Sequence, residues 1–213
     1  MSDLVRPLVG VLALHGGVSE HETALAEVGA DTRRVRAPED LDGLDGLVIP
    51  GGETTTIHRL TRGGELLPAL RSAVDAGLPT LGTCAGLIAL AAEVRGGSEP
   101  LVGGLDVAVR RNAWGRQPAS FEAPVHAPAL GGEDVPGVFI RAPRVEEVGP
   151  AAEVLATCGD EVVAVRQGVV WGTAFHPELT PDRRLHAAFL EVVRAGHAEG
   201  DERRTGGACR VGA

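Results

Sequence analysis

The 213-residue sequence contains no lysine, because all 20 of its cationic residues are arginine. A Schiff base on a lysine side chain is therefore excluded. Aromatic residues make up only 3% of the chain and tyrosine is absent, which argues against stacking platforms for nucleic-acid bases. The formal net charge of −9 also argues against a nucleic-acid footprint, which would need a basic stripe. The composition therefore predicts no nucleic-acid partner.

Cysteine and long apolar runs are also scarce. The three cysteines are widely spaced and odd in number, so they form neither a disulfide framework nor a zinc site. No run approaches the roughly 18 apolar residues of a membrane-spanning helix. The first ten residues lack the apolar core of a secretory signal. We therefore expect a cytoplasmic protein with no metal, no cofactor and no membrane partner.

One local pattern occurs three times in the first half of the chain. A short apolar run ends in a turn with glycine and leads into a helical segment, around residues 8–17, 46–52 and 78–86. Such βα units predict a mostly parallel sheet flanked by helices. Because sites gather at the carboxyl ends of parallel strands, Gly16, Gly52 and Cys84 are expected at one edge.

The second half of the chain changes character. Residues 105–176 hold several β-like runs separated by glycine and proline, which indicates added antiparallel strands and hairpins. A helical period over residues 182–197 closes the domain. The predicted class is therefore a single-domain α/β fold over residues 1–196. A polar, glycine-rich segment at 197–213 is expected to be a disordered tail.

The stretch Gly82-Thr83-Cys84-Ala85-Gly86 has the form of a nucleophile elbow. An apolar strand precedes it and a predicted helix, over residues 85–94, follows it, as that motif requires. A helix N-terminus behind Cys84 would favour its thiolate and aim the Ala85 N–H at a developing oxyanion. Gly16 is a second candidate for the oxyanion hole. Taken alone, however, a cysteine in apolar surroundings is more often a core residue.

A partner for the thiolate follows the last β-like run. In the stretch "FHPE", His176 ends the run and Glu178 lies two residues later. In an extended chain these two side chains face the same side, so Glu178 could orient the His176 imidazole. The three residues then predict a Cys–His–Glu triad.

The remaining histidines and cysteines are weaker candidates. His15 lies near the same edge but has no adjacent acid to orient it, and Cys158 and Cys209 have no partner. The others are read most simply as surface or helix-face residues: His21, His58, His126, His186 and His197.

With these motifs together, the sequence resembles the class I (triad) glutamine amidotransferases, through "GTCAGL" and "FHPE". The segments "LVIPGGETTTI", "RNAWGRQPASFE" and "VFIRAPRVEEVG" resemble one branch, the glutaminase subunits of pyridoxal 5'-phosphate synthase. The resemblance covers about residues 8–194 and implies a flavodoxin-like fold. It implies hydrolysis of L-glutamine through a thioester on Cys84, with ammonia passed to a barrel-shaped synthase subunit in a large hetero-oligomer.

The resemblance also implies a glutamine pocket. An arginine suits the α-carboxylate of glutamine because its planar fork donates two charge-assisted hydrogen bonds. The residues that the family places in this pocket are Gly52, Glu53, Thr54, Arg111, Ile140 and Arg141.

The chain departs from the family at two positions. His15 stands where glutamine is usual, and Thr54 where serine is usual. Thr54 keeps the hydroxyl, whereas His15 lies in a loop that responds to synthase docking in the family. We therefore expect glutaminase activity to be low in the isolated chain and to rise with the synthase.

Three other hypotheses stay open at this point. The chain could serve a different synthase, such as that of the imidazole glycerol phosphate pathway, although "RNAWGRQ" and "FIRAP" speak against this. It could be a non-catalytic docking partner, although the intact Cys84, His176 and Glu178 speak against this. It could also be another thiol hydrolase or stress protein of related fold, where two arginines beside a glutamine-shaped pocket are not expected.

Overall fold

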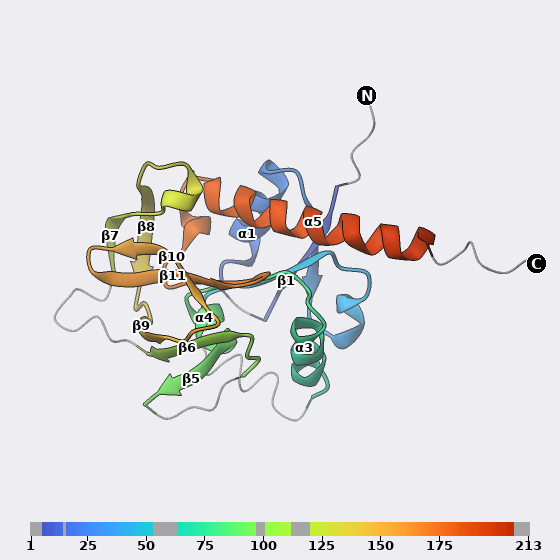
Figure 1. Ribbon diagram of the computed structural model, residues 1–213, viewed down its shortest axis with the longest axis horizontal. Helices are drawn as coiled ribbons and strands as arrows, with labels where there is room; N and C mark the ends of the chain where they lie inside the picture. The colour runs from blue at the N-terminus through green and yellow to red at the C-terminus, as the bar shows by residue number, and fades with distance from the viewer. Residues whose placement is uncertain (1–5, 15, 53–63, 97–100, 112–119, 207–213) are drawn as a thin grey trace, which may run out of the picture.

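The structure, a computed structural model, describes residues 6–14, 16–52, 64–96, 101–111 and 120–206. In this part of the chain the largest sheet has seven strands, in the order β10-β11-β12-β4-β3-β1-β2 (Figure 1). Five neighbouring strands are parallel: β1 (Leu8–Leu12), β2 (Asp31–Val35), β3 (Gly46–Ile49), β4 (Thr80–Thr83) and β12 (Val170–Thr173). Their order, β2-β1-β3-β4-β12, is that of flavodoxin-like sheets. The expected α/β class is thus confirmed.

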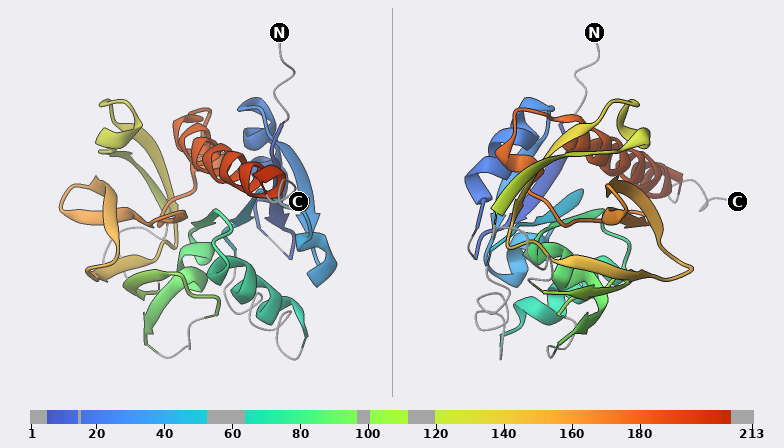
Figure 2. Two further views of the ribbon diagram at one scale, coloured as in Figure 1. Left: turned by 45° about the vertical axis from the view of Figure 1, so that its right-hand side comes forward. Right: turned by 90° about the vertical axis from the view of Figure 1, so that its left-hand side faces the viewer.

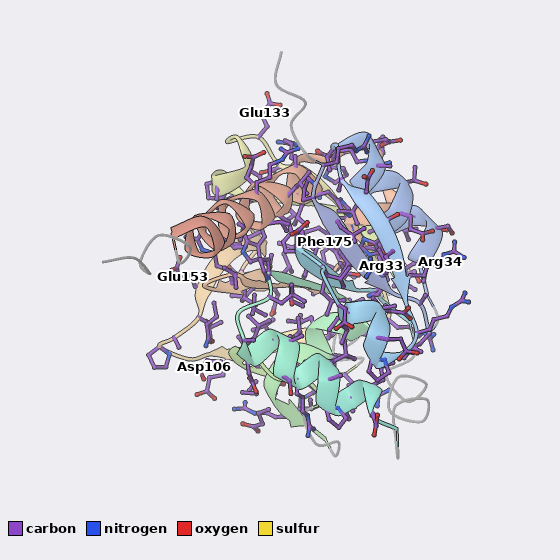
Figure 3. All side chains as sticks on the ribbon, turned by 90° about the vertical axis from the view of Figure 1, so that its right-hand side faces the viewer. Arg33, Arg34, Asp106, Glu133, Glu153 and Phe175 are labelled. Carbon is purple, nitrogen blue, oxygen red and sulfur yellow. The ribbon has the colours of Figure 1, made fainter. Side chains whose placement is uncertain are left out.

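Helices cover both faces of the parallel strands, and the two views of Figure 2 show this layering. One face carries α1 (Val18–Glu27) and α5 (Arg184–Gly206), and the other carries α3 (Leu66–Asp75) and α4 (Ala85–Leu90). Glycines in the strands let the helices approach closely. A Cβ on Gly46 of β3 would lie 2.7 Å from a Val193 methyl of α5, and one on Gly172 of β12 would lie 2.5 Å from Leu87 of α4. The buried layer is largely aliphatic; Phe175, labelled in Figure 3, is 1% exposed.

The other strands extend the main sheet or form two small sheets. Strands β10 (Glu153–Cys158) and β11 (Glu161–Gln167) continue the main sheet antiparallel beyond β12. The small sheets contain β5 (Ala91–Arg95), β6 (Leu105–Arg110) and β9 (Arg144–Val148) in one, and β7 (Ser120–Val125) and β8 (Val135–Ile140) in the other. The described residues also include three short 3₁₀ turns: η1 (Pro38–Leu41) between β2 and β3, η2 (Pro128–Leu130) between β7 and β8, and η3 (Pro177–Leu179) between β12 and α5.

Added antiparallel strands were expected here, but two pairings differ from that expectation. Strand β12 runs parallel to β4 and belongs to the central sheet, and β5 pairs with β6 in parallel.

The helix expected over residues 85–94 is shorter than its sequence suggests. It ends at Leu90, and the chain turns into strand β5 at Ala91. The amides of Val102 and Gly103 both donate to the Ala89 carbonyl, which a longer helix would use itself. Tertiary pairing therefore overrides the helical propensity of this alanine-rich stretch.

The last helix is longer than expected. Helix α5 continues to Gly206, so the predicted tail is helical up to that residue, and residues 207–213 lie outside the described part. None of the helices in the described ranges is long and apolar enough to cross a membrane.

Candidate active site

Cys84 occupies a strained turn between β4 and α4. Its φ is +50° and its ψ is −102°, a conformation that costs a non-glycine residue energy and that is concentrated at functional sites. The Cys84 N–H donates to the Thr173 carbonyl at 2.7 Å, which fixes the turn to the end of β12. The flanking glycines are required, because a Cβ on Gly82 would lie 2.6 Å from the backbone of Gly86, and one on Gly86 would lie 1.9 Å from the Ile49 carbonyl oxygen. This is the geometry expected of a nucleophile elbow.

His176 and Glu178 lie together just after β12. The His176 Nδ1 nitrogen lies 2.7 Å from Glu178 Oε1, and the Glu178 side chain is 1% exposed. The two residues were expected in an extended chain, but Pro177 begins the 3₁₀ turn η3 between them. The turn keeps both groups on one side. With Nδ1 donating to the carboxylate, the Nε2 nitrogen of the ring is left for the cysteine.

Cys84 and His176 are in direct contact. Burial opposes a charge on His176, but hydrogen bonds and charge interactions with Cys84 and Glu178 outweigh it and raise the pKa of His176 to about 10. Burial also opposes the charged form of Glu178, yet the hydrogen bond from His176 and the nearby imidazoles hold the pKa of Glu178 below its usual value. A Cβ on Gly51 would lie 2.4 Å from His176 Cε1 and 3.2 Å from Cys84 Cβ. The site therefore favours the imidazolium form of His176 beside the Cys84 sulfur.

A cavity of about 420 Å³ opens over these side chains. It is lined by every predicted site residue that lies within the described part of the chain: Cys84, His176, Glu178, Gly52, Arg111, Ile140, Arg141, Ala85 and Gly16. The other predicted pocket residues, Glu53 and Thr54, lie outside the described residues, as does His15. The cavity is also lined by Gly17, Glu20, Gly51, Ile88 and Leu179.

Two glycine loops meet on one side of this cavity. Gly16 has a φ of +86°, and a Cβ there would lie 1.8 Å from the Gly51 carbonyl oxygen. The Gly51 N–H donates to Thr83 Oγ1 at 3.1 Å, so it is not free for a substrate oxygen. Ala85 opens α4, where the first N–H groups of a helix have no partner within the helix. Ala85 and Gly16 thus remain the candidates for an oxyanion hole.

The end of strand β8 contributes Ile140 and the following Arg141 to the lining of the cavity. The His176 N–H donates to the Val138 carbonyl at 2.8 Å, which ties β8 to the loop of the imidazole. Cys84 Sγ lies 3.8 Å from the Ile140 carbonyl oxygen. Arg141 follows with a φ of +44°, so the described residues other than glycine with positive φ are Cys84 and Arg141. Both line the cavity, and backbone strain therefore coincides with the candidate site.

Two histidines that were read as surface or helix-face residues lie on helix faces that are buried. His21 and His186 are both 0% exposed and lie behind Glu178, not at the surface. A signal was present, because each shares the buried face of its helix with apolar residues: His21 with Ala24 and Leu25, and His186 with Phe189 and Leu190. His126, in contrast, is exposed as expected. In the described residues, no cluster of three or more His, Cys, Asp or Glu side chains is arranged to hold a metal ion.

A strained cysteine turn that faces a histidine–carboxylate pair at the carboxyl edge of a doubly wound sheet defines a thiol hydrolase of the triad type. Comparison with known proteins narrows this class. The model of the SNO glutamine amidotransferase family matches residues 11–195, and the chain belongs to this family.

Named relatives and a solved structure agree with this family. The chain is 57% identical over 190 residues to the pyridoxal 5'-phosphate synthase subunit PdxT of Clavibacter michiganensis, covering 88% of this chain and 91% of that protein. It is 55% identical over 192 residues to the same subunit of Streptomyces avermitilis, covering 89% and 95%. A crystal structure described as a glutamine amidotransferase superposes with a TM-score of 0.82 at 47% identity, covering 87% of this chain and 98% of that chain.

Proposed function

We propose that this glutamine amidotransferase hydrolyses L-glutamine to L-glutamate and ammonia at Cys84 and delivers the ammonia to the synthase subunit of a pyridoxal 5'-phosphate synthase. The observation that carries the proposal is the contact of Cys84 with a His176 imidazole that is paired with Glu178. The names of the relatives support the choice of synthase. A cytoplasmic location fits, because the reactive thiol needs a reducing compartment.

The first half-reaction uses the thiolate and the imidazolium. The Cys84 sulfur attacks the side-chain carboxamide carbon of glutamine, and a tetrahedral intermediate forms whose oxyanion is bound by backbone N–H groups, with Ala85 and Gly16 as candidates. The intermediate collapses with cleavage of the C–N bond. His176 gives its proton to the leaving nitrogen, so ammonia departs and a γ-glutamyl thioester remains on Cys84.

The second half-reaction returns the enzyme to its starting state. Neutral His176 takes a proton from water, and the hydroxide attacks the thioester carbon. The C–S bond breaks, glutamate leaves, and Cys84 is again a thiolate beside an imidazolium. Throughout, Glu178 holds the ring orientation and stabilises the charged imidazole.

Glutamine is proposed to be recognised by residues that line the cavity. Arg111 and Arg141 line the cavity, and each guanidinium offers a paired donor set for the α-carboxylate. The backbone of Ile140 and Gly52, together with Glu53 and Thr54, completes the proposed pocket. The synthase subunit, in a large hetero-oligomer, raises a low basal activity.

The test is ammonia release from glutamine by the wild type and by Cys84→Ala, each with and without the synthase subunit. We expect activity in the wild type only, mainly with the synthase, and a loss of at least about 10⁴-fold in the variant. A glutamine analogue that alkylates thiols should label Cys84. Residual activity of Cys84→Ala above background would reject the nucleophile, and equal wild-type rates with and without synthase would reject the activation.

A further inference from the structure

A buried polar cluster lies next to the triad, and the mechanism above uses only one of its members, Glu178. The cluster consists of His21 on α1, Thr83 at the end of β4 and His186 on α5, together with Glu178. Helices α1 and α5 pack beside each other on one face of the sheet (Figure 2). His21, Thr83 and His186 are each 0% exposed. Buried polar groups are costly unless they are paired, so this cluster calls for a role.

One member of the cluster, His21, faces the second carboxylate oxygen of Glu178. Glu178 Oε1 binds His176, but the buried Oε2 has no hydrogen bond within the described residues. Oε2 faces His21 Nε2 at 3.4 Å, which is longer than a normal hydrogen bond. The carboxylate therefore lies between two imidazoles.

The His21 ring also contacts two other members of the cluster. Its Nε2 lies 3.2 Å from Thr83 Oγ1, and its Nδ1 lies 3.1 Å from His186 Nε2. Thr83 in turn accepts the N–H of Gly51 at 3.1 Å. The ring is thereby fixed to the residue before Cys84 and to the glycine loop beside His176.

The hydrogen-bond partners assign the protons. Burial lowers the pKa of His21 and lowers that of His186 to about 3, so both rings are neutral at neutral pH. A neutral imidazole has one donor and one acceptor nitrogen. If His21 carries its proton on Nε2, it presents an N–H to Glu178 and Thr83, and its Nδ1 accepts from His186. The buried His186 Nδ1, which has no hydrogen-bond partner among the described residues, then carries only a lone pair.

The opposite tautomer is disfavoured. It would turn the His21 Nε2 lone pair toward the Glu178 carboxylate and leave His186 with a buried N–H that has no acceptor among the described residues. Orphaned N–H groups are rarer and more costly than orphaned acceptors. The ionisable groups that act on His21 are His176, Glu178, Glu20 and His186.

We propose that His21 is a positioning residue, whose Nε2–H anchors Glu178 Oε2 so that Oε1 stays on the His176 ring, with His186 fixing the tautomer of His21. The proposal rests on the proposed function only in that Glu178 serves the His176 base. A residue of this kind never touches substrate. Its loss should lower turnover and leave substrate binding nearly unchanged.

The matched pair His21→Gln and His21→Asn tests this role. Both introduce an amide, but only the glutamine side chain reaches as far as the imidazole Nε2. With the synthase subunit present, we expect His21→Asn to lower kcat for ammonia release by about 10- to 100-fold with little change in KM. His21→Gln should recover most of this loss. His126→Asn, at the exposed histidine that directly follows β7, is the control for a histidine-to-amide change.

A second readout does not depend on glutamine. The rate of Cys84 alkylation by iodoacetamide, followed against pH, reports how well His176 supports the thiolate. We expect the profile of His21→Asn to move to higher pH and that of His21→Gln to stay near the wild type. If the wild type alkylates in this way but releases no ammonia, the proposed function fails and the positioning role stands.

Two results would overturn the proposal. One is wild-type kcat and a wild-type alkylation profile in folded His21→Asn. The other is an equal loss of kcat in both variants with unchanged alkylation profiles, which would make His21 merely structural. Circular dichroism and thermal melting establish that each variant is folded before it is compared.

Discussion

The parallel strands and the added strands make different contributions to the same cavity. Cys84, His176 and Glu178 follow β4 and β12, two neighbouring parallel strands in the centre of the main sheet. Arg111 and Arg141 instead follow β6 and β8, which belong to the small sheets.

The difference separates chemistry from recognition. The side chains of the proposed reaction come from the buried core, where packing and hydrogen bonds hold a geometry to a fraction of an ångström. The side chains proposed to bind glutamine come from the periphery, where loops and hairpins vary with little cost to the fold. Changes in the central part should therefore affect turnover, and changes in the added part should affect binding.

The largest effect that sharpens this comparison is expected for Glu178→Gln. The substitution keeps the shape but removes the charge that supports the His176 imidazolium, so kcat should fall by about 10²- to 10⁴-fold. Steady-state ammonia release with the synthase measures it. Glu161→Gln, on added strand β11 in an exposed pair with Arg144, is the matched control. A loss in Glu161→Gln as large as in Glu178→Gln would break the comparison.

A smaller effect, on substrate binding and not on turnover, is expected for Arg111→Gln. Loss of a charge-assisted hydrogen bond to the α-carboxylate should raise KM for glutamine by about 10- to 100-fold, with kcat nearly unchanged. The kinetics of wild type and variant over a wide range of glutamine concentration measure the two constants. Arg110→Gln is the control, since Arg110 is bound to Glu146 on the exposed small sheet. If Arg111→Gln lowers kcat and leaves KM unchanged, the division between chemistry and recognition is wrong.

The smallest effect concerns stability against acid. Burial, and to a lesser extent the neighbouring His21 ring, lower the pKa of His186 from 6.5 to about 3. The unfolded chain binds a proton there below about pH 6.5 while the native ring stays neutral, so stability falls as the pH drops from 6.5 toward 3. His186 should account for about 2 kcal/mol of the loss in unfolding free energy between pH 7 and pH 5.

Urea denaturation at the two pH values measures that loss. The difference between pH 7 and pH 5 should shrink in His186→Leu and stay as in the wild type in Arg110→Gln. An equal fall in His186→Leu and the wild type would show that the buried ring does not resist protonation.

Much of the fold could be predicted from the sequence because short local patterns indicate its strands, turns and helices. The three strand–turn–helix repeats predicted parallel strands whose carboxyl ends meet, and Gly16, Gly52 and Cys84 do line one cavity. "FHPE" could be paired with the elbow for the same reason, since both follow strand-like runs. The site as a whole needed the resemblance to a family, because nothing local links Arg111 or Arg141 to a cavity.

The sequence could not predict those features of the structure that depend on contacts between residues far apart in the chain. The end of α4 is set by amides from Val102 and Gly103, and no property of the alanine-rich stretch predicts these partners. His21 and His186 meet across 165 positions of sequence, so their pairing is invisible to any local pattern. Their places on apolar helix faces were visible, but read singly they gave no reason to place them behind Glu178.

The hydrogen bond from the Cys84 N–H to the Thr173 carbonyl has a consequence for transplanting such a site. It extends the register in which Gly82 faces Gly172 and Thr83 faces Thr173, so the spacing of nucleophile and base is counted in rungs of the ladder between two strands. A slip of one rung would move Cys84 by about 3.3 Å along the strand and reverse the face of every side chain on it. A designer who grafts these residues elsewhere must therefore copy the strand pairing first and the loops second.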